Sequence, residues 1–145
     1  MKNKLRYLLI ISLMYMGISC DNWTEGVYSF KLHNNTNESV WCYYSLDYPN
    51  TTLSLKKPHY AIVNPNMYVY FDSKNKWEDV ADTISIFILS NDTVDNYNWD
   101  RVRVDYNILK RYDISTSEMK SMVEIFYPPT EVMQGVKQYP PYSSE

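Results

Sequence analysis

The chain has 145 residues, a length that suits one domain with an ordinary hydrophobic core. Its formal net charge is −3 and its basic residues are dispersed, which argues against a nucleic-acid partner, because nucleic-acid binding requires clustered Lys and Arg. The composition combines 15 Tyr and 4 Trp with only 3 Gly, and this balance favours β-strands, on whose pleated surface aromatic side chains pack well.

Residues 1–20 have the layout of a secretion signal. Basic residues within positions 2–6 precede an apolar run over 8–16, and small residues from Gly17 lead into Cys20. This arrangement resembles a bacterial lipoprotein signal, in which the chain is cut just before the cysteine and the cysteine thiol is acylated. The apolar run is well short of the roughly 20 residues that a transmembrane helix needs. Two alternatives to a lipoprotein signal stay open. The stronger one is an ordinary signal peptide, because many lipoproteins have Leu where this chain has Gly17. The other is that Cys20 is an ordinary cysteine of the protein core.

The lipoprotein interpretation divides the chain at Cys20. Residues 1–19 would be the signal peptide, and their removal changes the formal charge from −3 to −6, because they contain three basic residues and no acidic one. Residues 20–26 would be a lipid-anchored spacer that holds the protein at a membrane surface. Asp21 resembles an enterobacterial inner-membrane retention signal, whereas acids after the cysteine of Bacteroidetes lipoproteins resemble a surface-export signal. We expect a lipid anchor in the outer membrane, with the cell surface as the candidate location.

Two pairs of alternating segments follow the spacer. Residues 27–33 alternate apolar and polar side chains, as a half-buried strand does, and residues 39–45 form a second strand after an Asn-rich turn. Residues 60–64 and 67–71 are two further predicted strands on either side of Pro65-Asn66. The spacing therefore predicts two β-hairpins.

The pattern changes in the middle of the chain. Residues 76–81 place apolar side chains at helical spacing, which predicts a short helix. Residues 83–89, TISIFIL, form an apolar run rich in β-branched residues, and such a run predicts a central strand that is buried on both faces. Residues 90–100 are mostly polar and predict a loop with a helical turn. Alternation returns over residues 102–108, which predicts a strand with one face in water.

The remaining residues predict one more helix and one more strand. Ser115 and Glu118 have the spacing of a capping box, so we expect a short helix over 116–122 and a final strand over 123–127. Residues 130–145 have no period and predict a flexible C-terminal tail.

The predicted elements define a fold class. The β-rich domain would span residues 27–129, with the tail over 130–145 outside it. Short strands separated by turn signals are typical of a single antiparallel β-sandwich or an open barrel. We expect a mainly β domain of about seven strands with one or two short helices.

Three segments of the chain resemble a known group of proteins. Residues 82–89, 106–115 and 126–129 are similar to parts of the small uncharacterised lipoproteins of Bacteroides and Prevotella, and the resemblance covers roughly residues 34–129. It implies a source of the Bacteroidetes type and an envelope location, and it brings no catalytic residues with it. The tail after residue 129 departs from that pattern.

The same resemblance implies two candidate O-glycosylation sites. Thr83 and Thr93 each stand between an Asp and an apolar residue, a pattern similar to the glycosylated threonines of exported Bacteroidetes proteins. Thr93 is the better candidate because it lies in a polar segment, whereas Thr83 begins the apolar run. So short a pattern also recurs by chance.

No pattern in the sequence is typical of an active site. The two histidines, His33 and His59, lack the companion residues of a metal site, and neither a phosphate-binding loop nor a nucleophile motif is present. Cys42 stands among apolar residues and is expected to be a small buried side chain. We therefore expect no catalytic residues, no cofactor and no metal. A small envelope enzyme is the alternative, in which two carboxylates across a cleft would come from the paired Glu78-Asp79 and the scattered Asp95, Asp100 and Asp105.

The surplus of aromatic residues is the feature that points to a function. Exposed Tyr and Trp rings stack on sugars and on partner proteins. The candidate ligand-stacking residues lie on or beside predicted loops: Tyr43, Tyr48, Tyr97 and Trp99. Filling the core of a small sheet is the alternative role for such rings.

The expected function is a non-catalytic binding or accessory module of the cell envelope. Its partner would be a glycan or an envelope protein, and its only contact with the membrane would be the lipid anchor. A strip of exposed rings would favour the glycan, whereas an apolar patch or an open sheet edge would favour the protein.

Overall fold

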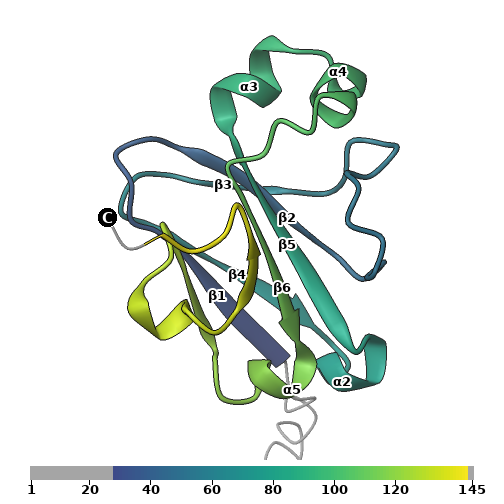
Figure 1. The fold of residues 1–145 in the computed structure, drawn as a ribbon, viewed down its shortest axis with the longest axis vertical. Coiled ribbons are helices and arrows are strands. Elements are labelled where there is room, and N and C mark those ends of the chain that lie inside the picture. The colour runs from purple at the N-terminus through teal and green to yellow at the C-terminus, as the bar shows by residue number, and fades with distance from the viewer. Residues whose placement is uncertain (1–27, 144–145) are drawn as a thin grey trace, which may run out of the picture.

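Eight strands form two sheets in the computed structural model, which describes residues 28–143. The smaller sheet has the strand order β4-β1-β7, and the larger sheet has the order β3-β2-β5-β6-β8 (Figure 1). The strands are β1 (Tyr28–Asn34), β2 (Val40–Ser45), β3 (Ala61–Val63), β4 (Tyr68–Ser73), β5 (Thr83–Ser90), β6 (Lys110–Ser115), β7 (Glu124–Tyr127) and β8 (Lys137–Tyr139). The predicted signal peptide over 1–19, the predicted lipidation site Cys20 and the predicted spacer over 20–26 lie outside the described residues. The two sheets confirm the predicted mainly β sandwich.

Short helices connect these strands and cover their ends. α3 and α4 lie at one end of the sandwich, and α2 and α5 lie at the other (Figure 1). The predicted capping box is confirmed at α5, where Ser115 Oγ accepts a bond from the Glu118 N–H (3.2 Å) and Glu118 Oε2 accepts one from the Ser115 N–H (2.9 Å). No helix within residues 28–143 is long and apolar enough to cross a bilayer. The helices are α2 (Trp77–Val80), α3 (Asn91–Asn96), α4 (Trp99–Val104), α5 (Thr116–Met119) and the 3₁₀-helix η1 (Glu131–Met133).

The predicted central strand is confirmed in β5. It pairs with β2 on one side and with β6 on the other, both antiparallel. Its two faces belong to two hydrophobic clusters, which explains why the apolar run is nearly unbroken. Ile84, Ile86 and Ile88 join the inner core between the sheets, whereas Phe87 and Leu89 join a second cluster.

The second cluster lies on the outer face of the larger sheet, and we call it the outer core. It packs the outward side chains of β2 and β5 against α3, α4 and the loop between β2 and β3. These segments therefore form a partial third layer over the larger sheet. The buried members of the outer core are Trp41, Tyr43, Leu53, Phe87, Leu89, Val94 and Val102.

Neither predicted hairpin forms. β1 pairs with β4 in antiparallel and with β7 in parallel orientation, whereas β2 pairs with β3 and β5, so the chain crosses between the sheets after β1 and again after β3. The buried Asn34 side chain stabilises this crossing, because its Nδ2 donates to the carbonyl oxygens of Glu38 (2.7 Å) and Val63 (2.9 Å). Alternation shows that one face of a strand is buried, but it contains no information about the strand's partner.

The predicted strand over residues 102–108 is wrong, and the loop before it is largely helical. Residues 99–104 form α4, which is capped by Asn98, whose Oδ1 accepts from the Asp100 N–H at 2.8 Å. Val102 is buried, whereas Val104 is 71% exposed, so the alternating residues do not share a buried face. Together with α3, this helix raises the number of α-helices in residues 28–143 above the one or two that we expected.

The predicted flexible tail over 130–145 is also wrong for most of its length. η1 and β8 lie within it, and β8 pairs antiparallel with β6. Met133 and Val136 are buried in the inner core, and the Lys110 ammonium donates to the Pro140 carbonyl at 2.7 Å. The segment therefore belongs to the sandwich, and the domain extends beyond residue 129. Its elements are too short to show a period, and their partners lie far away in the sequence.

Candidate functional site

Two of the four predicted ligand-stacking rings are held in the outer core. Tyr43 is 2% exposed and stacks on Phe87, with ring centroids 4.9 Å apart and planes inclined by 10°. Trp99 is half-buried: its ring lies 5.5 Å from that of Trp41, and its Nε1 donates to the Ser54 carbonyl at 2.9 Å. Burial therefore leaves Tyr43 little exposed surface for stacking on a ligand, and that role stays a prediction.

The other two predicted rings lie apart from each other. Tyr97 is 49% exposed at the end of α3, with the Arg101 guanidinium 5.3 Å from the centre of its ring. Tyr48 lies in the loop after β2, and its hydroxyl accepts a bond from the Lys137 ammonium at 2.9 Å. The four residues consequently form no common strip.

Both candidate glycosylation sites have partly exposed side chains. Thr83 is the first residue of β5, and Thr93 lies within α3 rather than in a loop. Each lines a shallow surface hollow, Thr93 together with Tyr97 and Thr83 together with Tyr48. Their modification remains a prediction.

Tyr43 and three tyrosines that were not predicted line a groove of about 560 Å³. The groove lies at the side of the sandwich where β3, an edge strand of the larger sheet, meets β4, an edge strand of the smaller sheet. Its volume falls within the range that is usual for ligand pockets. We call it the tyrosine groove, and its lining residues are Tyr43, Tyr44, Ser45, Leu46, Asp47, Ser54, Pro58, His59, Tyr60, Ala61, Tyr70 and Phe71.

The walls of the groove are rings that the core holds in place. Tyr60 is 49% exposed and stacks on the buried Trp41, with centroids 4.7 Å apart and planes inclined by 26°. Tyr44 packs edge-on against Phe71 (5.6 Å) and Trp77 (5.4 Å). A ligand would therefore meet rings that are already ordered before it binds.

Polar side chains lie among these rings. Asp47 and Ser45 interact with each other, because Ser45 Oγ donates to Asp47 Oδ2 and accepts from the Asp47 N–H, both at 3.2 Å. Ser54 and His59 complete the polar part of the lining. The lining includes one carboxylate, and the Lys57 ammonium lies 5.5 Å from the centre of the Tyr60 ring, so the groove offers hydrogen-bonding groups without a cluster of positive charge.

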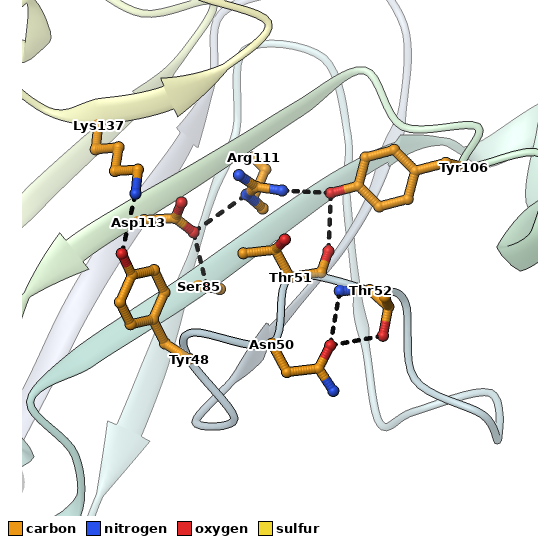
Figure 2. A network of polar contacts seen from close by, with 9 residues as sticks. All are labelled: Tyr48, Asn50, Thr51, Thr52, Ser85, Tyr106, Arg111, Asp113 and Lys137. Atoms are coloured by element: carbon orange, nitrogen blue, oxygen red, sulfur yellow. Dashed lines mark hydrogen bonds and ion pairs between the residues drawn. The ribbon is translucent and has the colours of Figure 1, made fainter.

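A buried polar network stabilises the loop that forms one wall of the groove (Figure 2). The Tyr106 hydroxyl donates to the Thr51 carbonyl at 2.9 Å and accepts from Arg111 Nη1 at 2.6 Å. Arg111 in turn lies 3.1 Å from the Asp113 carboxylate, which accepts a bond from the Ser85 hydroxyl at 2.7 Å. β6 supplies both charged residues and Ser85 belongs to the central strand β5, so the network ties the loop after β2 to these two strands of the larger sheet.

A second aromatic surface adjoins the groove on the outer face of the smaller sheet. Tyr68 and Tyr70 are each 51% exposed, and their ring centroids are 5.5 Å apart. The His33 ring follows 5.5 Å from Tyr68, and Phe126 stacks on His33 at 4.8 Å. We call this row the tyrosine ladder. Tyr70 belongs to both the ladder and the groove.

Sequence reasoning missed Tyr60, Tyr68 and Tyr70. A usable signal existed for the latter two, because residues 68–72 alternate, with Val69 and Phe71 directed to the core and the tyrosines directed outward. Tyr60 carried no such signal, since the strand that follows it is only three residues long.

The shifted pKa values of the described residues have structural causes. Hydrogen bonds from Lys120 and from Lys31 lower the pKa of Glu78 and of Glu124, whereas a general acid needs a raised pKa. Burial raises the pKa of the Cys42 thiol to about 12, so this thiol is a poor nucleophile. Within residues 28–143, no group of three or more His, Cys, Asp or Glu side chains is placed to hold a metal ion.

Comparisons with protein-family models, characterised proteins and solved structures give no match to this chain.

Proposed function

We propose that the protein is a non-catalytic, lipid-anchored cell-envelope protein that binds a glycan in the tyrosine groove. The observation that supports this function is a groove whose walls are tyrosine rings and whose remaining lining includes Ser45, Asp47, Ser54 and His59. The apolar faces of sugar rings stack on aromatic rings, and their hydroxyl groups bond to polar side chains.

The order of the groove supports the same function. Tyr60 rests on Trp41, and Tyr44 is wedged between Phe71 and Trp77, so these rings lose little conformational entropy when a ligand binds. A weakly hydrophobic ligand such as a sugar benefits from such preorganisation, because little binding free energy is lost in ordering the site.

The proposed anchor places this groove near a membrane. Acylation at Cys20 with several chains, each buried methylene contributing about 0.8 kcal/mol, would make attachment effectively permanent. The spacer over 20–26 would allow a separation of at most about 25 Å between lipid and domain. The outer membrane fits the resemblance to Bacteroidetes lipoproteins, and a glycan at the cell surface would lie within reach.

A glycan array followed by titration calorimetry tests the binding site. We expect Tyr60→Ala to weaken binding of the selected glycan by about tenfold or more, because one aromatic stacking contact corresponds to roughly this change in affinity. Tyr97→Ala is the matched control, since Tyr97 is also 49% exposed but lies away from the groove. A loss with Tyr97→Ala and none with Tyr60→Ala would place the site elsewhere.

Cell fractionation tests the anchor and the location separately. Cys20→Ala should release the protein from membranes, and protease added to intact cells should degrade the wild-type domain if it faces outward. A Cys20→Ala variant that stays membrane-bound would contradict the lipid anchor. A protected wild-type domain would contradict the cell-surface location.

The open edge of the smaller sheet favours a second function, an accessory subunit of an envelope complex. β4 pairs with β1 on one side, and its other edge borders the groove, so a strand of a partner protein can be added there. A photo-crosslinking residue at the exposed Asp72 should then give one defined adduct in cells. As the control, the photo-crosslinking residue is placed at Asp92, which is exposed on α3, and it should give no adduct.

A further inference from the structure

We infer that the ligand is an uncharged glycan chain several sugars long, which leaves the tyrosine groove at Tyr70 and continues along the tyrosine ladder. This inference rests on the proposed glycan-binding function and specifies the ligand of the same site. It distinguishes a longer oligosaccharide from a mono- or disaccharide, which the groove alone would hold.

The continuity of the two surfaces is the first argument. Tyr70 lines the groove and is also the first ring of the ladder, where Tyr68 lies next to it at 5.5 Å. Cross-strand register then places His33 opposite Tyr68, and Phe126 opposite His33. The rings therefore run across three paired strands, from the open side of the sandwich to the far strand of the smaller sheet.

The charge of the ladder is the second argument. Lys31 lies opposite Tyr70 in the register, and its ammonium is 4.9 Å from the centre of the Tyr68 ring and 5.4 Å from that of Tyr70. The ammonium also pairs with Glu124 at 2.9 Å, so the two charges compensate each other. An ammonium has three donors, and the ones that Glu124 does not use can bond to sugar hydroxyls. An uncharged polyhydroxyl chain suits this face better than an acidic one.

The composition of the ladder also argues against a protein partner on this face. Lys, Glu and Asp are depleted in the centres of protein interfaces, whereas Lys31 on the central strand and its partner Glu124 on β7 lie beside the rings, and Asp72 is exposed beside Tyr70. A row of rings flanked by hydrogen-bonding groups instead suits a sugar chain, because each sugar has an apolar face and a polar rim.

Chain-length dependence of binding tests this inference. The full-length protein in detergent micelles is titrated with cello-, malto-, xylo- and manno-oligosaccharides, each from the disaccharide to the hexasaccharide. We expect the Kd of the preferred series to fall about tenfold or more with length, since each further ring contact is worth up to about tenfold. Tyr68→Ala should remove most of that gain and leave the Kd of the disaccharide within about twofold.

Two variants separate the outcomes. Tyr60→Ala should weaken the disaccharide and the hexasaccharide alike, and Tyr68→Phe should bind the hexasaccharide nearly as well as the wild type because it keeps the ring. Equal Kd values for short and long chains, still sensitive to Tyr60→Ala, would overturn the chain inference and leave the groove in place. Binding of acidic glycans alone would overturn the uncharged ligand, and absence of binding to every glycan of the array would overturn the proposed function and this inference together.

Discussion

The two outer faces of the sandwich use aromatic residues in opposite ways. On the larger sheet, Trp41, Tyr43 and Phe87 point outward and are buried beneath α3, α4 and the loop after β2. On the smaller sheet, Tyr68 and Tyr70 point outward and remain half exposed. The comparison shows that aromatic content alone does not identify a binding surface. Whether a third layer covers the face decides if a ring becomes core or surface.

The two sides of the sandwich differ in the same way. On one side, η1 and β8 bring Met133 and Val136 into the inner core, and the Tyr112 hydroxyl donates to the Phe126 carbonyl at 2.7 Å across the sheets. On the other side, β3 is too short to cover β4, and the tyrosine groove remains between them. The C-terminal segment closes one side, and the candidate site occupies the side that it leaves open.

Phe87→Ala gives the largest expected effect and tests whether the covered face is a true core. Phe87 is fully buried and stacked on Tyr43, so the change should lower the free energy of unfolding by about 3–5 kcal/mol. Urea denaturation followed by circular dichroism measures the loss. A loss below about 1 kcal/mol would mean that α3 and α4 do not pack tightly on the larger sheet.

Asp113→Ala tests the polar network of Tyr106, Arg111 and Asp113 that stabilises the loop after β2. The substitution leaves the Arg111 guanidinium nearly buried without its carboxylate and should cost about 3 kcal/mol of unfolding free energy. Asp105→Ala is the control, because Asp105 pairs with Arg101 on the surface and should change stability by less than about 0.5 kcal/mol. Equal effects in the two variants would contradict a buried network beneath the loop.

Met133→Ala tests the closed side of the sandwich. Met133 is fully buried in the inner core, so its truncation should cost about 2 kcal/mol or more. The neighbouring Val132 is 71% exposed and provides the control substitution Val132→Ala. If Met133→Ala were as stable as the control in the same urea titration, the C-terminal segment would be the flexible tail that its composition indicates.

The inner face of β2 predicts a dependence of stability on pH through Cys42. Burial raises the pKa of its thiol from 9.0 to about 12, so the folded chain retains this proton at pH values where the unfolded chain loses it. Stability should therefore fall as the pH rises above 9.0, by up to about 1.4 kcal/mol per pH unit from this residue. The difference between wild type and Cys42→Ala isolates the thiol from the buried tyrosines. If the difference in unfolding free energy between wild type and Cys42→Ala stayed constant from neutral pH to high pH, the predicted contribution of the buried thiol would be contradicted.

Tyr68→Ala gives the smallest expected effect on stability and completes the comparison with Phe87→Ala. Its ring is half exposed, so only cross-strand contacts are lost, and the cost should stay below about 1 kcal/mol. A thermal melt measures this directly. A loss as large as that of Phe87→Ala would show that the ladder is structural and would weaken its role as a binding surface.

Local features of the fold were predictable because they depend on residues close in the sequence. The capping box at Ser115 and Glu118 and the doubly buried strand β5 were identified correctly. Alternation over residues 102–108 misled, because the Asn98 cap started a helix that placed only Val102 in the core. Here the Asn98 cap was a local signal for a helix, but the longer alternating pattern led to the prediction of a strand.

The sequence by itself therefore determined a mainly β domain rich in aromatic residues, its central strand and one capped helix, because periods and caps arise from contacts within a few residues. Tertiary structure decided the pairing of β1 with β7, the cover over Trp41 and Tyr43, and the open groove beside Tyr70. These features depend on distant pairs, such as the bond from Lys31 on β1 to Glu124 on β7, 93 residues apart. Which rings remain exposed follows from those distant contacts, and no local pattern contains them.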